Sequence, residues 1–242
     1  MLSSQMRILR VFGLPAAEVR AALRAVQAEG CPGLRLLERD GEFAVCVQVS
    51  APSQAMADEY CENGTQKLRA RLGDAVYADG ETSPGSGHAG CAAEKAPPAG
   101  GGGRGHRTPI GAQLQPLEHS EAAYDFGTQT WADRDTMRKL VTPASLLEKF
   151  PGDVVQAAAG RAQLALSFGG ADYAVVYMPA TVGQAPFVLL CDKKGAVAIA
   201  VSPDHSDAAI ANSLLDMVRR RALGLKPLAS AITFRPGHER RC

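Results

Sequence analysis

Residues Ser83 to Pro109 limit the possible folds of this 242-residue chain more than any other stretch does. The segment holds eight Gly and four Pro, and it lacks Val, Ile, Leu, Phe, Tyr and Trp. Ordering a residue costs about 1–2 kcal/mol, and a segment with so little apolar surface cannot recover that cost by burial. Apolar periodicity stops at Tyr77 and resumes near Ile110. We therefore expect two folded lobes, at 6–80 and 120–234, a flexible tether over 81–119, and a frayed tail over 235–242.

Charge and composition argue against several classes of protein. The chain has 26 Lys and Arg against 25 Asp and Glu, so it lacks the basic excess of a nucleic-acid binder. Neither a signal peptide nor an apolar run of membrane length is visible, so we expect a cytoplasmic protein with no membrane partner. The six cysteines form no CxxC pair and are expected to be free thiols. The Arg219–Arg221 run is interpreted as cations at a helix C-terminus.

The first lobe is predicted to have the order βαββαβ, an α+β sandwich with two helices on one face of a small sheet. Arg7–Leu14 is typical of a strand, and Pro15 suits the first turn of a helix. The apolar face of this helix comprises Val19, Ala22, Leu23 and Val26. Gly30–Gly33 matches the GXXG loop of nucleotide-binding KH domains, but it carries no cation and follows a helix, so we interpret it as a helix stop.

The Asp40-Gly41 dipeptide is the strongest local signal, because it favours a type I′ turn between two strands. Counting back from this turn places Leu36 opposite Val45 and Leu34 opposite Val47, which gives the sheet one apolar face.

A second helix is expected after Ser53, whose side chain can cap it, and Gly73 would end it before a last strand at Asp74–Ala78. Asn63-Gly64 would weaken the middle of this helix by about 1 kcal/mol. The predicted buried stripe comprises Met56, Tyr60, Leu68 and Leu72.

The second lobe is predicted to be a three-layer α/β domain, because helices and strands alternate. Strand 172–178 is almost continuously apolar, which suits burial on both faces of a mixed sheet. The expected helices start near Thr142, Asp153 and Ser206 or Asp207, and the last two end at Gly169-Gly170 and Gly224. The other expected strands are 124–131, 187–191 and 196–201.

Two phrases of the first lobe, RILRVFGLPAAEV (Arg7–Val19) and RLGDAVYADGET (Arg71–Thr82), resemble the KH-like linking domain of CinA-type proteins, the competence/damage-inducible family. The resemblance continues in the second lobe through residues 124–162, AVAIAV (Ala196–Val201) and the helix after His205. It includes no counterpart of the family's N-terminal, molybdopterin-binding-like domain. It implies a homodimer and a nicotinamide-nucleotide amidase domain, which hydrolyses nicotinamide mononucleotide to nicotinate mononucleotide and ammonia.

The resemblance also implies a serine nucleophile in an ESCTGG phrase, a tyrosine and a lysine that activate it, and a TGIAGP loop for the nucleotide. This sequence has no ESCTGG, and residues near Ser83–Pro109 stand where that phrase and its strand should be. The tyrosine and lysine positions fall on Trp131 and Thr136, and Tyr177–Gly183 replaces the glycine-rich loop. None of the amidase's functional residues therefore carries over. Because nucleophile and base act as a unit, losing both removes the route to amide hydrolysis. If the second lobe lacks that strand, its sheet must either tolerate a missing neighbour or borrow a strand, with Ile110–Leu117 or a second subunit as the candidate source.

Three residues are candidates for a catalytic role unrelated to the amidase motif. Cys191 and His205 form a conceivable nucleophile pair, and Ser202 is an alternative nucleophile, although Cys191 more simply packs in a core as a small hydrophobe. The Asp204–Asp207 stretch could ligate a metal, but its place before a helix favours capping. We predict no cofactor and no metal.

The leading hypothesis is a catalytically degenerate CinA-like protein that acts as a binding or assembly module, with a pyridine nucleotide as candidate ligand. One alternative is an active nicotinamide-nucleotide deamidase or other hydrolase with a relocated nucleophile. Another is a nucleotide sensor that binds without chemistry.

Overall fold

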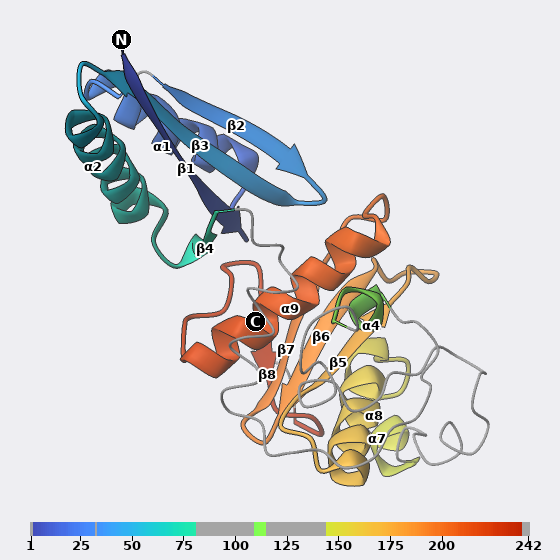
Figure 1. The fold of residues 1–242 in the computed structure, drawn as a ribbon. Coiled ribbons are helices and arrows are strands. Elements are labelled where there is room, and N and C mark those ends of the chain that lie inside the picture. The colour runs from blue at the N-terminus through green and yellow to red at the C-terminus, as the bar shows by residue number, and fades with distance from the viewer. Residues whose placement is uncertain (1, 32, 81–108, 115–143, 239–242) are drawn as a thin grey trace. The chain divides into compact units, whose positions relative to one another are not determined.

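The computed structural model describes residues 2–31, 33–80, 109–114 and 144–238. The chain divides into two compact units, Met1–Gly87 and His88–Cys242, and each has its own antiparallel sheet (Figure 1). The protein therefore contains both helices and sheets, which confirms the predicted mixed α+β class. Among these residues, no helix has the length and apolar character needed to cross a membrane.

The first unit confirms the predicted βαββαβ order, and its strands pair antiparallel in the order β2-β3-β1-β4. Helices α1 and α2 share one core with a single face of the sheet. The elements are β1 (Ser3–Phe12), α1 (Ala16–Ala28), β2 (Leu34–Arg39), β3 (Glu42–Ala51), α2 (Gln54–Leu72), the 3-10 turn η1 (Gly73–Ala75) and β4 (Val76–Asp79).

The β2–β3 hairpin follows the prediction made from its turn. Asp40 and Gly41 have φ of 52° and 75°, the left-handed values that a type I′ turn requires. Leu36 pairs with Val45 and Leu34 with Val47, so the apolar side chains face the helices. Turn chemistry alone was therefore sufficient to set this register.

Helix α2 begins and ends where predicted, but only Leu68 and Leu72 of its predicted buried stripe are buried. The Ser53 hydroxyl accepts a hydrogen bond from the Met56 amide at 3.3 Å, and Gly73 caps the other end. Met56 and Tyr60 are 37% and 49% exposed. The face that packs on the sheet comprises Ala57, Cys61, Gly64, Thr65, Leu68 and Leu72. Small residues fill the first half of that face because the helix lies close to β3 there.

Gly64 makes this close approach possible. A Cβ atom at this position would lie 2.7 Å from the Cys31 Sγ atom and 3.2 Å from a Val47 methyl group. Gly33 is required in the same way, because a Cβ there would lie 1.7 Å from the Gln48 carbonyl oxygen. The second glycine of the GXXG segment is therefore explained by packing against β3.

The second unit has its described strands in the order β5-β6-β7-β8, all antiparallel. Along β6, Phe187, Leu189 and Cys191 pack toward α8, whereas Val188 and Leu190 pack toward α9. The sheet thus lies between two helical layers, as Figure 1 also shows. The elements are α4 (Pro109–Leu114), α7 (Ala144–Lys149), α8 (Val154–Gly169), β5 (Ala174–Met178), β6 (Phe187–Asp192), β7 (Gly195–Ala200), α9 (Asp207–Leu223) and β8 (Ile232–Phe234).

The structure contradicts two of the predictions made for this sheet. It is antiparallel rather than mixed throughout the described strands. Within that part of the chain β5 is an outer strand, so its residues are half-buried or exposed rather than buried on both faces. The strand predicted at 124–131 and the Thr142-Pro143 helix start lie outside the described residues.

Helix α4 corrects the expectations for the tether and for a replacement strand. Ile110 and Leu114 are buried in the core formed with α9. The Gln113 side-chain amide donates to Asn212 Oδ1 at 3.1 Å. Residues 109–114 therefore form a helix that belongs to the second unit, rather than a flexible connection or a strand.

The predicted tail also starts too early. Strand β8 pairs with β7, and the chain beyond it is held by the buried side chain of Gln156. This amide accepts from the Gly237 N–H at 3.1 Å and donates to the His238 carbonyl at 2.6 Å. Lys149 adds a hydrogen bond to the Gly237 carbonyl at 2.7 Å. Residues 235–238 are thus fixed against α7 and α8.

Replacing Gly64 by Ala should destabilise the protein, although Ala favours helix by about 1 kcal/mol. The new Cβ forces Cys31 and Val47 apart, and overpacking of this kind costs about 1–3 kcal/mol. Chemical denaturation should show a lower free energy of unfolding for Gly64→Ala and no loss for Asn63→Ala, the exposed neighbour. In a Cys31→Ala background the cost of Gly64→Ala should shrink. A stabilised Gly64→Ala protein would contradict the close packing.

Candidate functional site

The sequence-based site residues fall into two groups. Trp131 and Thr136, which the resemblance aligns with an activating tyrosine and lysine, lie outside the described residues. Cys191, Ser202 and His205 are described, and they come from β6 and from the loop between β7 and α9. Their geometry can be compared directly with the chemistry proposed for them.

Cys191 is a core residue. Its side chain is fully buried among apolar side chains between β6 and α8. Burial, helped by the negative charge of Asp192, raises the pKa of the Cys191 thiol to about 11. A thiol is a nucleophile only as the thiolate, so this environment suppresses reactivity at neutral pH. The structure agrees with the interpretation of Cys191 as a small hydrophobe.

Cys191 and His205 do not form a pair. Cys191 lies opposite Ala196, whereas Phe187, at the other end of β6, lies opposite Ala200 and next to the loop that carries His205. Four residues of strand separate the two ends, about 13 Å at the usual rise per residue. The proposed base is therefore at the wrong end of the sheet.

Ser202 and His205 are exposed and belong to a turn. The Ser202 hydroxyl accepts a hydrogen bond from the Asp204 amide at 3.3 Å, and the His205 amide donates to the Ser202 carbonyl at 3.2 Å. Ser206 caps α9 by accepting from the Ala209 amide at 3.2 Å. Among the residues that the structure describes, no three His, Cys, Asp or Glu side chains gather as metal ligands.

The Tyr177–Gly183 segment, which the resemblance aligns with a glycine-rich loop, leads into a closed turn. The amides of Thr181 and Gln184 each donate to the carbonyl of the other, at 3.0 and 3.1 Å. These donors are used within the turn, so they do not form the open row of N–H groups that cradles a phosphate. Val182 stands fully exposed at the tip, and Gly183 has φ of 78°.

A cluster of charges that the sequence did not reveal lies at the C-terminal end of α9. Asp216 is completely buried and accepts hydrogen bonds from Arg219 at 2.8 Å and from Arg220 at 2.7 Å. Arg221 makes a bidentate pair with Asp192, at 2.7 and 2.9 Å. The Arg219–Arg221 run therefore forms specific ion pairs, beyond the dipole effect predicted.

Tyr173 lies close to this cluster. Burial, together with the charges of Asp172 and Asp192, raises the pKa of its phenol. A phenol with a raised pKa is less able to act as a general base near neutral pH. The cluster therefore does not supply an activated tyrosine.

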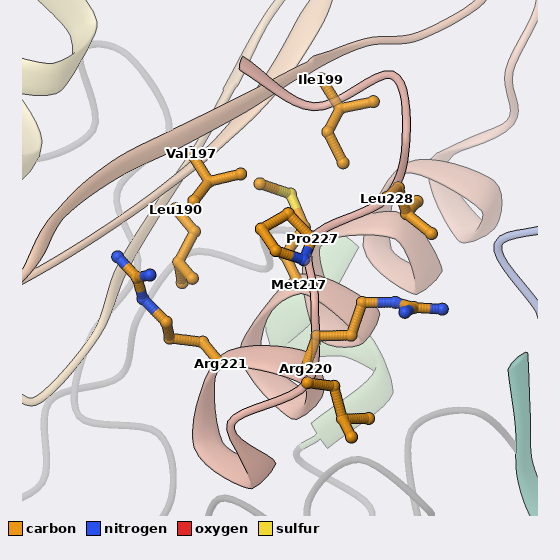
Figure 2. Close-up of a pocket in the computed structure, with 9 residues that line it drawn as sticks. Leu190, Val197, Ile199, Met217, Arg220, Arg221, Pro227 and Leu228 are labelled. Carbon is orange, nitrogen blue, oxygen red and sulfur yellow. The ribbon is translucent and has the colours of Figure 1, made fainter. Parts of the chain in front are cut away.

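A small apolar cavity adjoins the cluster, between the end of α9 and β7 (Figure 2). Arg220 and Arg221 border it, but their guanidinium groups point to opposite sides and bind aspartates. Its volume of about 30 Å³ suits a few water molecules rather than a nucleotide. The remaining lining residues are Leu190, Val197, Ile199, Met217, Leu225, Pro227 and Leu228.

Comparison with known proteins adds no assignment: no family model and no curated protein matches the chain. The described cysteines Cys31, Cys46, Cys61 and Cys191 are free thiols, as expected from the sequence.

Removing the buried carboxylate of the α9 cluster should be costly. Asp216→Ala leaves Arg219 and Arg220 buried without that acceptor, and breaking such a pair typically costs about 3–5 kcal/mol. Urea denaturation should show this loss, while Asp204→Ala, an exposed aspartate before the same helix, should change stability by less than about 0.5 kcal/mol. Equal effects of the two substitutions would contradict a structural role for the cluster.

Cys191 should resist alkylation in the folded protein. With its pKa at about 11, the thiolate is on the order of one part in a thousand at pH 8, and the sulfur is fully buried. Iodoacetamide treatment followed by peptide mass mapping should leave Cys191 unmodified in the native protein and modify it in urea. Rapid native labelling would show that the thiol is accessible and activated.

Proposed function

We propose that this chain is a catalytically inactive relative of the CinA-type nicotinamide-nucleotide amidases and acts as a binding or assembly module. The observation that carries the proposal is in the sequence. The chain has no ESCTGG phrase, and Trp131 and Thr136 occupy the positions of the activating tyrosine and lysine. A serine hydroxyl without its base and oxyanion donors does not attack an amide.

The arrangement of the first unit supports the resemblance. Its βαββαβ order agrees with the order expected for the linking domain. In the second unit, α8, strand β7 and α9 lie where the resemblance predicts the small-residue helix, the last strand and the final helix. Both observations concern element order, so they support kinship rather than activity.

The described candidate groups support the absence of catalysis. Cys191 is buried with a raised pKa, and His205 is near the opposite end of β6. The turn at Thr181–Gln184 uses its own amides, so it offers little to a nucleotide phosphate. A relocated Cys/His nucleophile pair is therefore disfavoured by both protonation and distance.

For the binding or assembly role, a second copy is the simplest partner and a pyridine nucleotide is the candidate ligand. The near balance of charges, 26 basic against 25 acidic residues, suits protein association better than nucleic-acid binding.

An ammonia-release assay with nicotinamide mononucleotide tests the proposal. The purified chain should release no ammonia above a blank without enzyme, since it lacks the nucleophile and its base. Added ammonium verifies detection in the same reaction mixture. Release above the blank would overturn the proposal, and loss of that activity in Cys191→Ala or Ser202→Ala would identify a relocated nucleophile.

A further inference from the structure

Strand β2 forms one edge of the first sheet (Figure 1). The two-residue turn at Asp40-Gly41 makes Arg39 and Glu42 a hydrogen-bonded pair, and such pairs alternate along an antiparallel ladder. The hydrogen bond from the Gln48 amide to the Gly33 carbonyl, at 2.8 Å, agrees with this alternation. The backbone groups that point away from the sheet are therefore those of Leu34, Leu36 and Glu38.

Most of these groups have no partner among the described residues. The Leu34 carbonyl accepts a long hydrogen bond, 3.5 Å, from the Gln27 side chain. The outward N–H groups of Leu34, Leu36 and Glu38, and the carbonyls of Leu36 and Glu38, make no hydrogen bond within the part of the chain described.

This edge carries only part of the usual protection against pairing. Exposed edge strands in natural proteins commonly carry charged residues (Lys above all), Pro or a bulge. Strand β2 has the charged residues Arg35, Glu38 and Arg39, but it contains neither Lys nor Pro, and its register with β3 is unbroken. Leu37 is 64% exposed beside the free backbone groups.

We propose that β2 pairs antiparallel with β2 of a second copy of this chain, across a two-fold axis at Leu36. In this register Leu36 lies opposite itself, and Leu34 lies opposite Glu38 of the second copy. All outward-facing residues of β2 then exchange N–H···O=C hydrogen bonds. The two sheets become one continuous sheet with the helices of both copies on the same side.

Side-chain charge favours a second copy as the partner. Arg20, Arg24 and Gln27 form one stripe of α1, and this stripe lies along β2 because Arg20 contacts Glu38 at 3.5 Å and Gln27 contacts Leu34. Arg24 is exposed and has no ion pair within the described residues. The two-fold register brings Glu38 of the second copy next to Leu34, within the reach of Arg24.

This inference gives the proposed assembly role a partner and rests on that role only to this extent. It is argued from the first unit, so it can fail while the ammonia assay still shows no activity. Likewise, the chain can release ammonia in that assay and still dimerise through β2.

Light scattering and sedimentation of the full chain over a range of concentrations test the pairing. The wild-type chain should dimerise, and Glu38→Pro should be monomeric, with the mass falling from that of two chains to 25.4 kDa. Proline removes the outward N–H of residue 38 and leaves the β2–β3 hydrogen bonds intact. Glu38→Ala keeps that N–H and is the matched control, which should still dimerise. Arg24→Glu should weaken the dimer by facing one acid with another.

Hydrogen exchange on the wild-type chain gives a second readout that needs no variant. The Leu36 amide should become slower to exchange as the concentration rises, whereas an amide of the β2–β3 ladder, such as that of Leu37, should not change. A chain that stays monomeric, a Leu36 amide whose exchange ignores concentration, or a folded Glu38→Pro dimer would each overturn the proposal.

Discussion

The double burial of β6 is the constraint on which the second unit depends. Its side chains alternate between the α8 and α9 layers, and every residue from Phe187 to Asp192 is buried. A strand in this position has no surface to offer to a substrate. Cys191 is therefore a packing residue for the same reason that Val188 is. Asp192, at the end of the strand, is its one polar residue. Its carboxylate binds Arg221 and accepts hydrogen bonds from the backbone amides of the turn to β7.

Features governed by neighbouring residues were predictable from the sequence. The Asp40-Gly41 turn fixed the register of β2 and β3, and the caps at Ser53, Asp153 and Ser206 fixed where three helices begin. Each depends on contacts within a few residues. Features governed by distant contacts were missed. The phase of α2 was misjudged because apolar Met56 and Tyr60 were taken as buried, whereas the close approach of the helix to β3 requires Gly64. Composition does not reveal such an approach.

The candidate site divides in the same way. The sequence identified Cys191 as more simply a core residue, because an apolar strand surrounds it. It did not identify the ion pairs of Asp216 and Asp192, because an arginine run before a helix end is explained equally well by the helix dipole. Helical spacing was the available signal: Asp216 precedes Arg219 and Arg220 by three and four residues, the separations at which helical side chains meet.

The hydrogen bonds of Gln156 to Gly237 and His238 have a consequence for how the chain folds during synthesis. The first unit has all four of its described strands once Asp79 has been added. The second unit needs β8 beside β7, and it needs Gly237 and His238 beside α8. During synthesis, domains generally fold as units, the N-terminal one first. The Gln156 side chain therefore cannot form its hydrogen bonds to Gly237 and His238 until almost the whole of this sequence has left the ribosome.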